Sequence, residues 1–363
     1  MAALQAPLAD ITRLEAGMSL PSLRKGPLTS THIVRWLAAQ QNWDKIHHDH
    51  GFCRDVAGLP GPIVNGALKQ HFIVQLLSES FGEGAWVWRI DYRFFSADAV
   101  GSTLVVRGKV AGISTLEAVV LIDVDVEILD AATGIVSTSG HAVVLLRLDQ
   151  APVLQEPAYM RSPHPLPLAD VAGTLDVDIP AHIRQAVGST LEAKESRFPV
   201  DLSRLVMFAD AVMGLFPRHH DPAVAAAGAY GAVVAPPLYP LHGIEKLPGE
   251  LPLSTDMMSF GREGSNEVGR NMGTLFNISD AGLMNGGNRV EVHSLVRVGE
   301  RICANSVLAD VRRRTGKRGG EMLIFETVNR YWESRGRPLL TERQTIINRL
   351  DAGIGPNIPY PVS

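Results

Sequence analysis

Cysteine is scarce in this sequence, and the chain carries no excess of positive charge. Its two cysteines, Cys53 and Cys303, lie far apart, so they form neither the paired spacing of a metal site nor a disulfide framework. This usage fits a reducing compartment, and we expect a cytoplasmic protein with no metal and no organic cofactor. The net charge of −4 argues against a general nucleic-acid-binding protein, which would need a basic excess.

Long apolar segments of the kinds used for targeting are also missing. The first ten residues lack the basic and apolar regions of a secretory signal. The most apolar window, residues 223–241, contains Pro236, Pro237 and Pro240, which would break a membrane-spanning helix. We therefore expect a protein with no membrane partner. Its 363 residues, 45% of them hydrophobic, are enough for two domains with hydrophobic cores.

The first half of the chain predicts two helices and four strands. Ile33, Trp36 and Leu37 have helical spacing, and this helix leads into the segment NWDKIHHD at residues 42–49. Glycines and prolines then predict a loop, after which Asn65-Gly66 opens a helix so apolar that we expect it to be buried. Beyond residue 85 the apolar residues alternate. Strands are therefore expected at about 86–94, 103–110, 118–129 and 135–148.

The second half repeats this pattern after a proline-rich stretch. A helix from about Leu202 to Met213 leads into His219-His220-Asp221, and His219 follows His47 by 172 residues. Val298-Gly299 echoes Val100-Gly101 at an offset of 198, which leaves about 26 extra residues that we place in 263–288. Two markers in the same order predict a duplication. We expect domains at 1–150 and 196–363 joined by a linker at 151–195, with late strands at about 289–293, 301–314, 321–333 and 338–349.

These motifs resemble the MaoC-like (R)-specific enoyl-CoA hydratase/dehydratase superfamily. The first half carries Ile46-His47-His48-Asp49, Ile63-Val64-Asn65-Gly66 and the strand entry at 100–104, VGSTL. The second half resembles the FAS1-type dehydratase module in residues 235–237, 296–300 and 312–320. The resemblance implies an α+β fold of two tandem hot-dog units, each a long helix wrapped by a curled antiparallel sheet. It also implies reversible hydration of a trans-2-enoyl thioester of CoA or acyl carrier protein, with an (R)-3-hydroxy product.

The same resemblance indicates the catalytic residues. Family members commonly use an aspartate five residues before a histidine to hold and activate water; here the histidine is His47, and Asn42 stands in place of the aspartate. Imidazole, with an ordinary pKa of ~6.5, can act as base or acid near neutral pH. An amide can orient water but cannot exchange a proton. We predict His47 as the acid/base, with Asn42 and Asp44 positioning water, although His47 could be structural and Asp44 could only cap the turn.

Further residues are predicted to bind the substrate. Backbone N–H groups at a helix start can hold the thioester oxygen, which gains charge in the transition state. Gly66 would let the substrate approach, and Asn65 could add a donor. Asp49 could orient His47 or serve the turn, and His71 could face an acyl tunnel or pack in the core. A basic cluster could meet the CoA phosphates or form a solvated face: Arg312, Arg313, Lys317 and Arg318.

The second half has lost parts of this pattern. Gly214 stands five residues before His219, and Pro236-Pro237 replaces Asn65-Gly66. We therefore expect no active site there, but a role in supporting the first half and making room for a bulky acyl chain. Two other functions stay open from the sequence, a hot-dog thioesterase and a non-catalytic acyl-CoA-binding or partner subunit. A homodimer is also possible for such sheets.

Overall fold

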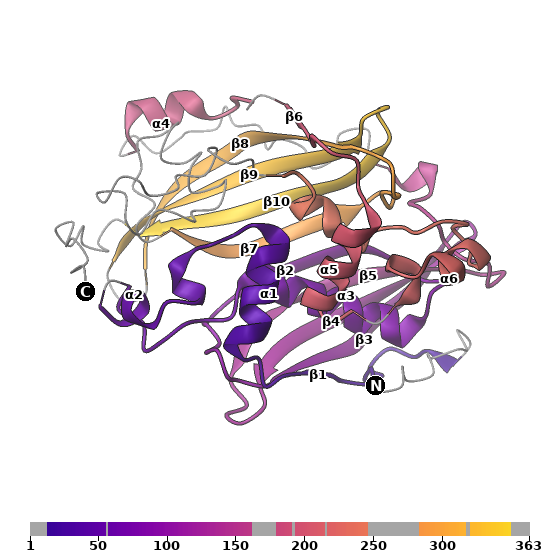
Figure 1. Cartoon of the computed structure of the whole chain (residues 1–363), viewed down its shortest axis with the longest axis horizontal. Coiled ribbons are helices and arrows are strands. Elements are labelled where there is room, and N and C mark those ends of the chain that lie inside the picture. The colour runs from indigo at the N-terminus through magenta and orange to yellow at the C-terminus, as the bar shows by residue number, and fades with distance from the viewer. Residues whose placement is uncertain are drawn as a thin grey trace.

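The main feature of the computed structural model is one ten-stranded sheet (Figure 1). The structure describes residues 13–55, 57–161, 179–190, 193–214, 216–245, 283–316 and 320–349. Its strands run in the order β1-β3-β4-β5-β2-β7-β10-β9-β8-β6. The bounds are β1 (Leu23–Lys25), β2 (Trp86–Phe94), β3 (Leu104–Leu116), β4 (Val119–Asp130), β5 (Val136–Arg147), β6 (Lys194–Glu195), β7 (Leu283–Val292), β8 (Ile302–Thr315), β9 (Glu321–Glu333) and β10 (Pro338–Arg349). The order is symmetric about its centre: β2, β5, β4, β3 and β1 follow outward on one side, and β7, β10, β9, β8 and β6 hold the same places on the other. A duplicated chain is expected to show this symmetry.

The two halves of the sheet join through β2 and β7. These strands pair antiparallel from Arg89 opposite Glu291 to Arg93 opposite Gly287. Gly287 has a φ of +145°, and a Cβ there would lie 2.2 Å from the carbonyl oxygen of Tyr92, so only glycine permits this close approach. The backbone hydrogen bonds of both halves therefore form one continuous sheet.

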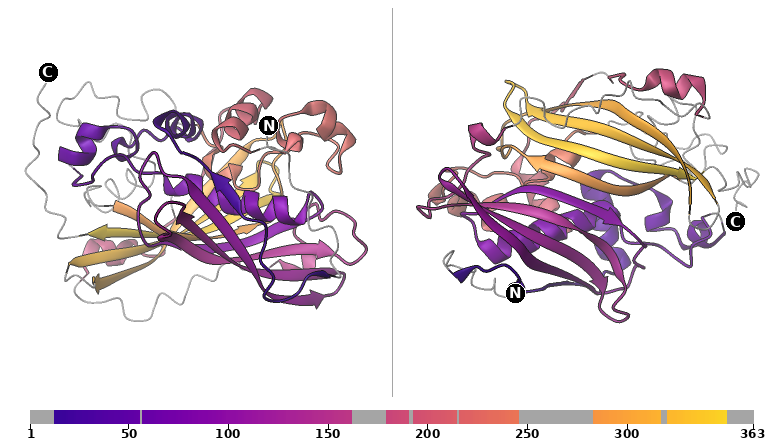
Figure 2. Two further views of the ribbon diagram at one scale, coloured as in Figure 1. Left: turned by 90° about the horizontal axis from the view of Figure 1, so that it is seen from below. Right: turned by 180° about the vertical axis from the view of Figure 1, so that it is seen from behind.

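The helices are α1 (Ser30–Gln40), α2 (His50–Asp55), α3 (Gly66–Phe81), α4 (Ala181–Ala186), α5 (Leu202–Ala211) and α6 (Pro222–Ala227), with short 3-10 helices η2 (Lys45–His47), η3 (Ala158–Met160), η4 (Pro217–His219) and η5 (Tyr239–His242). Apart from α4, which lies beside the strands of the second half and contacts β8, the α-helices of both halves lie on one side of the sheet (Figure 2). Counterparts α1 and α5 pack together. Trp36 and Phe208 occupy equivalent positions in them, and their ring centroids are 5.6 Å apart. Among the described residues no helix is long and apolar enough to cross a membrane.

Helix α3 is buried on nearly every side, which confirms the prediction from its composition. Several of its buried polar side chains are hydrogen-bonded, as burial favours. Gln70 accepts a hydrogen bond from the Tyr92 hydroxyl, and Gln75 donates to the Val212 carbonyl of the second half. One apolar cluster runs through both halves. The helix of the first half is therefore packed by both halves of the chain.

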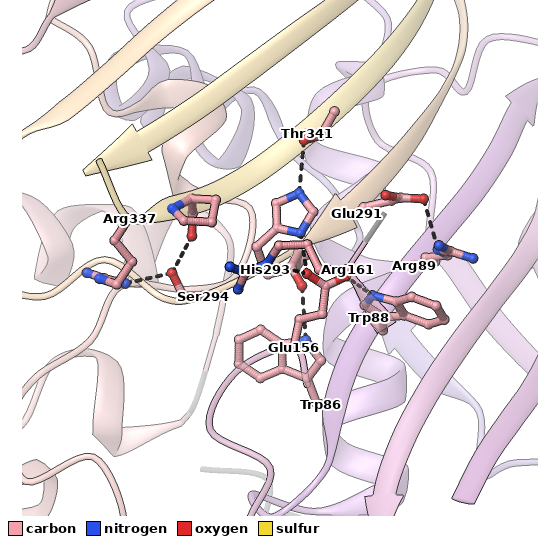
Figure 3. A network of polar contacts seen from close by, with 12 residues as sticks. Trp86, Trp88, Arg89, Glu156, Arg161, Glu291, His293, Ser294, Arg337 and Thr341 are labelled. Carbon is pink, nitrogen blue, oxygen red and sulfur yellow. Dashed lines mark hydrogen bonds and ion pairs between the residues drawn. The ribbon is translucent and has the colours of Figure 1, made fainter. Parts of the chain in front are cut away.

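A second polar network joins the segment after β5 to the second half (Figure 3). The Glu156 carboxylate accepts hydrogen bonds from Trp88 Nε1 at 2.7 Å and lies 2.8 Å from His293 Nδ1, while His293 Nε2 is 2.9 Å from Thr341 Oγ1. These groups lie on β2, the connecting segment, the end of β7 and β10. All of them are buried, so the network acts as an internal clamp between the halves.

Most strands and helices agree with the predicted ranges, with three corrections. Strand β3 continues to Leu116 rather than ending at about residue 110. Helix α2 lies where a loop was predicted. Strand β7 begins at Leu283 rather than at residue 289, although residues 283–288 are rich in glycine and asparagine. Pairing with β10, from Leu283 opposite Asn348 onward, supplies backbone hydrogen bonds that outweigh the low strand propensity of these residues. The rest of the expected insertion, residues 263–282, lies outside the described part. At the offset of 172 a counterpart of α3 would begin at about residue 238, where the described residues form the 3-10 helix η5, and residues 246–282 lie outside the described part.

Candidate active site

His47 lies at the end of η2, close to the start of α3. The Asp44 side chain caps η2 by accepting a hydrogen bond from Ile46 N at 3.2 Å. The imidazole is 7% exposed. Its Nδ1 is 2.9 Å from the carbonyl oxygen of Ile63, and its Nε2 is 3.0 Å from Asn65 Nδ2. Both ring nitrogens are thus engaged by the loop that leads into α3.

The hydrogen bonds around Asn65 define the protonation of His47. Asn65 Oδ1 accepts from Trp36 Nε1 at 3.1 Å and from Ala67 N at 2.8 Å, and both of these groups can only donate. The amide nitrogen of Asn65 must therefore face His47, so Nε2 accepts. Nδ1 then carries the proton and donates it to the Ile63 carbonyl. This tautomer follows from the network, and it leaves the lone pair of Nε2 as the basic site.

The charge state of His47 is set mainly by burial, which lowers its pKa; the nearby Asp44 carboxylate opposes this shift. A buried imidazole without a directly bonded carboxylate favours the neutral form. The His47 imidazole is therefore neutral at neutral pH and can accept a proton at Nε2.

Helix α3 begins at Gly66, with Asn65 as its N-cap residue. Asn65 Oδ1 satisfies the N–H of Ala67, and no described residue accepts a hydrogen bond from the N–H of Gly66. A Cβ at position 66 would come within 2.9 Å of the Phe94 ring, so that ring would have to shift if a larger residue stood here. An unpaired donor at the positive end of a long helix is suited to hold an oxygen that gains negative charge.

The two other predicted catalytic residues support the turn that carries His47. Asn42 Oδ1 accepts from Asp44 N at 3.1 Å, and Asn42 N donates to the Leu37 carbonyl at the end of α1. Asp44 caps η2, as described above. Within the described residues no hydrogen bond joins either side chain to His47. Asp44 therefore acts on the imidazole through its charge, and Asn42 through the backbone.

Asp49 and His71 lie at two different places near the site. Asp49 Oδ1 accepts from Phe52 N at 2.8 Å and so serves the start of α2. His71 lies between the halves, where its Nε2 is 3.3 Å from Nε2 of His242 and its ring contacts Trp36 and Phe208. Burial holds the pKa of His71 well below its ordinary value. Its surroundings are those of a packed core histidine.

The described arginines of the predicted CoA cluster already have acidic partners. Arg312 pairs with Asp310 and with Glu326, and Arg313 Nε lies 2.8 Å from Glu321. Lys317 and Arg318, the other two residues of the cluster, lie outside the described residues. Both described arginines of this cluster are therefore paired with carboxylates on β8 and β9.

The second half contains a counterpart of His47 in different surroundings. His219 Nδ1 is 2.8 Å from the Val234 carbonyl oxygen, which repeats the first-half contact, but its Nε2 accepts from Arg218 Nε at 3.3 Å. Burial, assisted by the Arg218 charge, lowers the pKa of His219 to about 3. Arg218 also donates to the Glu83 carbonyl beyond the end of α3. A cation thus engages the lone pair that is basic in the first half.

Two segments of the chain match known families. Residues 185–342 match the model described as "FAS1-like, dehydratase domain region", and residues 18–100 match "Hydroxyacyl-thioester dehydratase type 2". No curated protein sequence matches the chain. The matches bear out the resemblance of both halves to dehydratases and support dehydratase or hydratase activity in general.

Solved structures share the fold at low sequence identity. A MaoC domain protein described as a dehydratase, from Chloroflexus aurantiacus J-10-fl, has a TM-score of 0.63 at 12% identity over 95% of this chain and 99% of that one. A MaoC-like dehydratase has 0.57 at 15% over 95% and 99%. A conserved hypothetical protein from Mycobacterium tuberculosis, described as having a double hotdog fold, has 0.56 at 14% over 93% and 97%. The predicted double hot-dog fold is thereby confirmed.

Proposed function

We propose that this double hot-dog protein, both halves of which match dehydratase families, adds water reversibly to a trans-2-enoyl thioester, with CoA esters as its substrates. The observation that carries the proposal is the neutral His47 imidazole, whose basic Nε2 lies beside the start of the buried helix α3. The second half, where Arg218 engages the equivalent nitrogen, serves as a support without chemistry of its own.

In hydration, His47 Nε2 takes a proton from water while the water oxygen attacks Cβ of the enoyl group. The resulting imidazolium then gives its proton to Cα, so that one group serves as base and acid. The N–H of Gly66 holds the thioester oxygen while it carries negative charge. Before this can occur, Nε2 must exchange its hydrogen bond from Asn65 for one from water. The freed amide then donates to the water oxygen or to the substrate.

A non-catalytic acyl-binding subunit is the second candidate, because no carboxylate is hydrogen-bonded to His47 among the described residues. The test is a panel of trans-2-enoyl-CoA esters from short to long and branched chains. A hydratase removes the enoyl absorbance without releasing thiol, and this is the expected result. Saturable binding with unchanged absorbance would instead support the binding subunit, and release of CoA thiol would indicate a thioesterase.

The pH dependence of the rate gives a prediction specific to His47. Since only the neutral imidazole can take the proton from water, kcat/KM for hydration should fall as the pH drops through the His47 pKa. Burial lowers that pKa, so the fall should lie below the ordinary value of ~6.5. Asp44→Asn keeps a capping side chain but removes a charge that raises the pKa, and should move the fall to still lower pH.

The matched control for this prediction is His48→Gln, because the neighbouring His48 acts on the His47 pKa in the opposite direction. This variant should move the acid side of the kcat/KM profile to higher pH. Profiles of the wild type and both variants, measured on one enoyl-CoA ester, check the signs. Movement in the same direction for both variants would contradict the assignment of the titrating group to His47.

A further inference from the structure

We propose that Trp36 is a positioning residue for His47, and that the second half of the chain acts on the active site through this indole. The inference rests on the proposed hydratase function. Trp36 touches neither the reacting atoms nor His47 itself. It acts through Asn65, whose side chain lies between the indole N–H and the imidazole.

The indole N–H, together with the N–H of Ala67, sets which way the Asn65 amide faces. Asn65 Oδ1 is held by Trp36 Nε1 and by the N–H of Ala67, which leaves Nδ2 pointing to His47 Nε2. A reversed amide would present its oxygen to His47 and would favour a proton on Nε2. That form lacks the basic lone pair at Nε2, and its bare Nδ1 would face the Ile63 carbonyl. Removing the indole donor therefore weakens the preference for the reactive tautomer.

The indole is fixed in place mainly by aromatic rings of the second half. Trp36 is fully buried. Its ring makes edge-on contacts with His71 at 5.1 Å, with Phe208 of α5 at 5.6 Å and with His242 of η5 at 5.1 Å. Such T-shaped contacts are a favoured arrangement of aromatic rings and restrict rotation. Two of these three rings, those of Phe208 and His242, belong to the second half, in which Arg218 engages the counterpart of His47.

The internal duplication provides an independent comparison. At the offset of 172 residues that relates His47 to His219, Phe208 corresponds to Trp36. The carbonyls of Ile63 and Val234 hold equivalent places beside the two histidines, so Pro236 corresponds to Asn65. Phenylalanine has no N–H to donate, and proline has no side-chain amide to accept. Both members of the Trp36–Asn65 hydrogen bond are thus missing together in the half where Arg218 engages the imidazole. Within this chain, the Trp36–Asn65 hydrogen bond is therefore found only in the half whose histidine, His47, keeps a basic Nε2.

The test compares Trp36→Phe with Trp86→Phe. Each variant loses one buried indole N–H, since Trp86 Nε1 donates to the Val292 carbonyl at 3.0 Å, but Trp86 belongs to the junction of the sheet. For Trp36→Phe we expect kcat for enoyl-CoA hydration to fall ~10- to 100-fold, because small misplacements of catalytic groups are that costly, while KM changes little. Trp86→Phe should retain the wild-type kcat. Thermal midpoints measured for both variants report the cost to folding.

A second readout does not depend on activity. Nitrogen-15 NMR of histidine-labelled protein distinguishes the two imidazole tautomers, and the His47 signals are assigned by their loss in His47→Gln. The wild type and Trp86→Phe should show the Nδ1-protonated form, and Trp36→Phe should show a mixture. An unchanged tautomer in Trp36→Phe, or equal losses of kcat in both tryptophan variants, would overturn the proposal. A wild type with this tautomer but no hydratase activity would refute the proposed function and leave the positioning role intact.

Discussion

Replacing His47 by glutamine is expected to lower the rate of enoyl-CoA hydration by ~10²–10⁴-fold, the range that general acid–base catalysis supplies. Glutamine can keep hydrogen bonds to neighbouring groups, but its amide cannot take a proton from water. The same replacement at His219 should leave the rate close to that of the wild type. Arg218 already donates a hydrogen bond to the His219 imidazole. The pKa of His219, about 3, leaves this imidazole little basicity.

The two variants are well matched for their cost to the fold. Each histidine is 7% exposed, and each places Nδ1 beside a backbone carbonyl oxygen, at 2.9 Å for His47 and 2.8 Å for His219. The measurements are kcat on one enoyl-CoA ester and the thermal midpoint of each variant. Similar midpoints with a rate loss only in His47→Gln are expected. Equal rate losses in both would contradict the division of roles between the halves.

The largest expected effect on stability concerns a buried ion pair beside the site. Lys69 Nζ on α3 lies 2.8 Å from Asp98 Oδ2, and both side chains are 3% exposed. Ser137 also donates to this carboxylate, and the ammonium lies over the Phe94 ring. Removing one member of such a pair leaves an uncompensated buried charge. Asp98→Ala should therefore lower the free energy of unfolding by about 3–5 kcal/mol, measured by denaturant titration.

Two controls separate the charge effect from simple loss of contacts. Adding Lys69→Met to Asp98→Ala removes the stranded ammonium, so the double variant should recover much of the lost stability. Asp149→Ala breaks the exposed pair between Arg147 and Asp149 and should change the unfolding midpoint little. A double variant as unstable as the sum of its two single variants would show that the ion pair is not the cause.

Much of the fold follows from local patterns in the sequence. The switch from helical to alternating periodicity after residue 85 marks the start of β2, and the turn at residues 130–134 separates β4 from β5. The offset between His47 and His219 predicts the duplication that the sheet order displays. These features are predictable because each depends on residues that are near in sequence, or on two segments that repeat the same pattern.

The groups that surround His47 could not be predicted from local sequence patterns. Trp36 has the spacing of an ordinary core residue in α1, and only the packed structure directs its N–H to Asn65, 29 residues later. The role of Arg218 as the partner of His219 is equally hidden, because arginines beside a turn are usually solvated. The resemblance predicts that Asn42 and Asp44 position water beside His47, but the side-chain hydrogen bonds of both residues are made within the turn.

In the proposed reaction, these contacts would take the place of the aspartate that the resembling family commonly has at the position of Asn42. A carboxylate bonded to the histidine would favour its charged form. Here burial favours the neutral form, and a backbone carbonyl together with Asn65 orients the ring. The His47 ring is therefore oriented by neutral groups, and Asp44 raises its pKa through its charge.

The most direct measurement of the proposed function is mass spectrometry of an enoyl-CoA ester incubated with the protein in oxygen-18 water. Hydration at His47 predicts a product heavier by one labelled water, with the label on C3 and the thioester intact, and formation of this product ~10²- to 10⁴-fold more slowly with His47→Gln. An unchanged thioester across the whole panel, or a labelled free acid in place of the 3-hydroxyacyl-CoA, would contradict it.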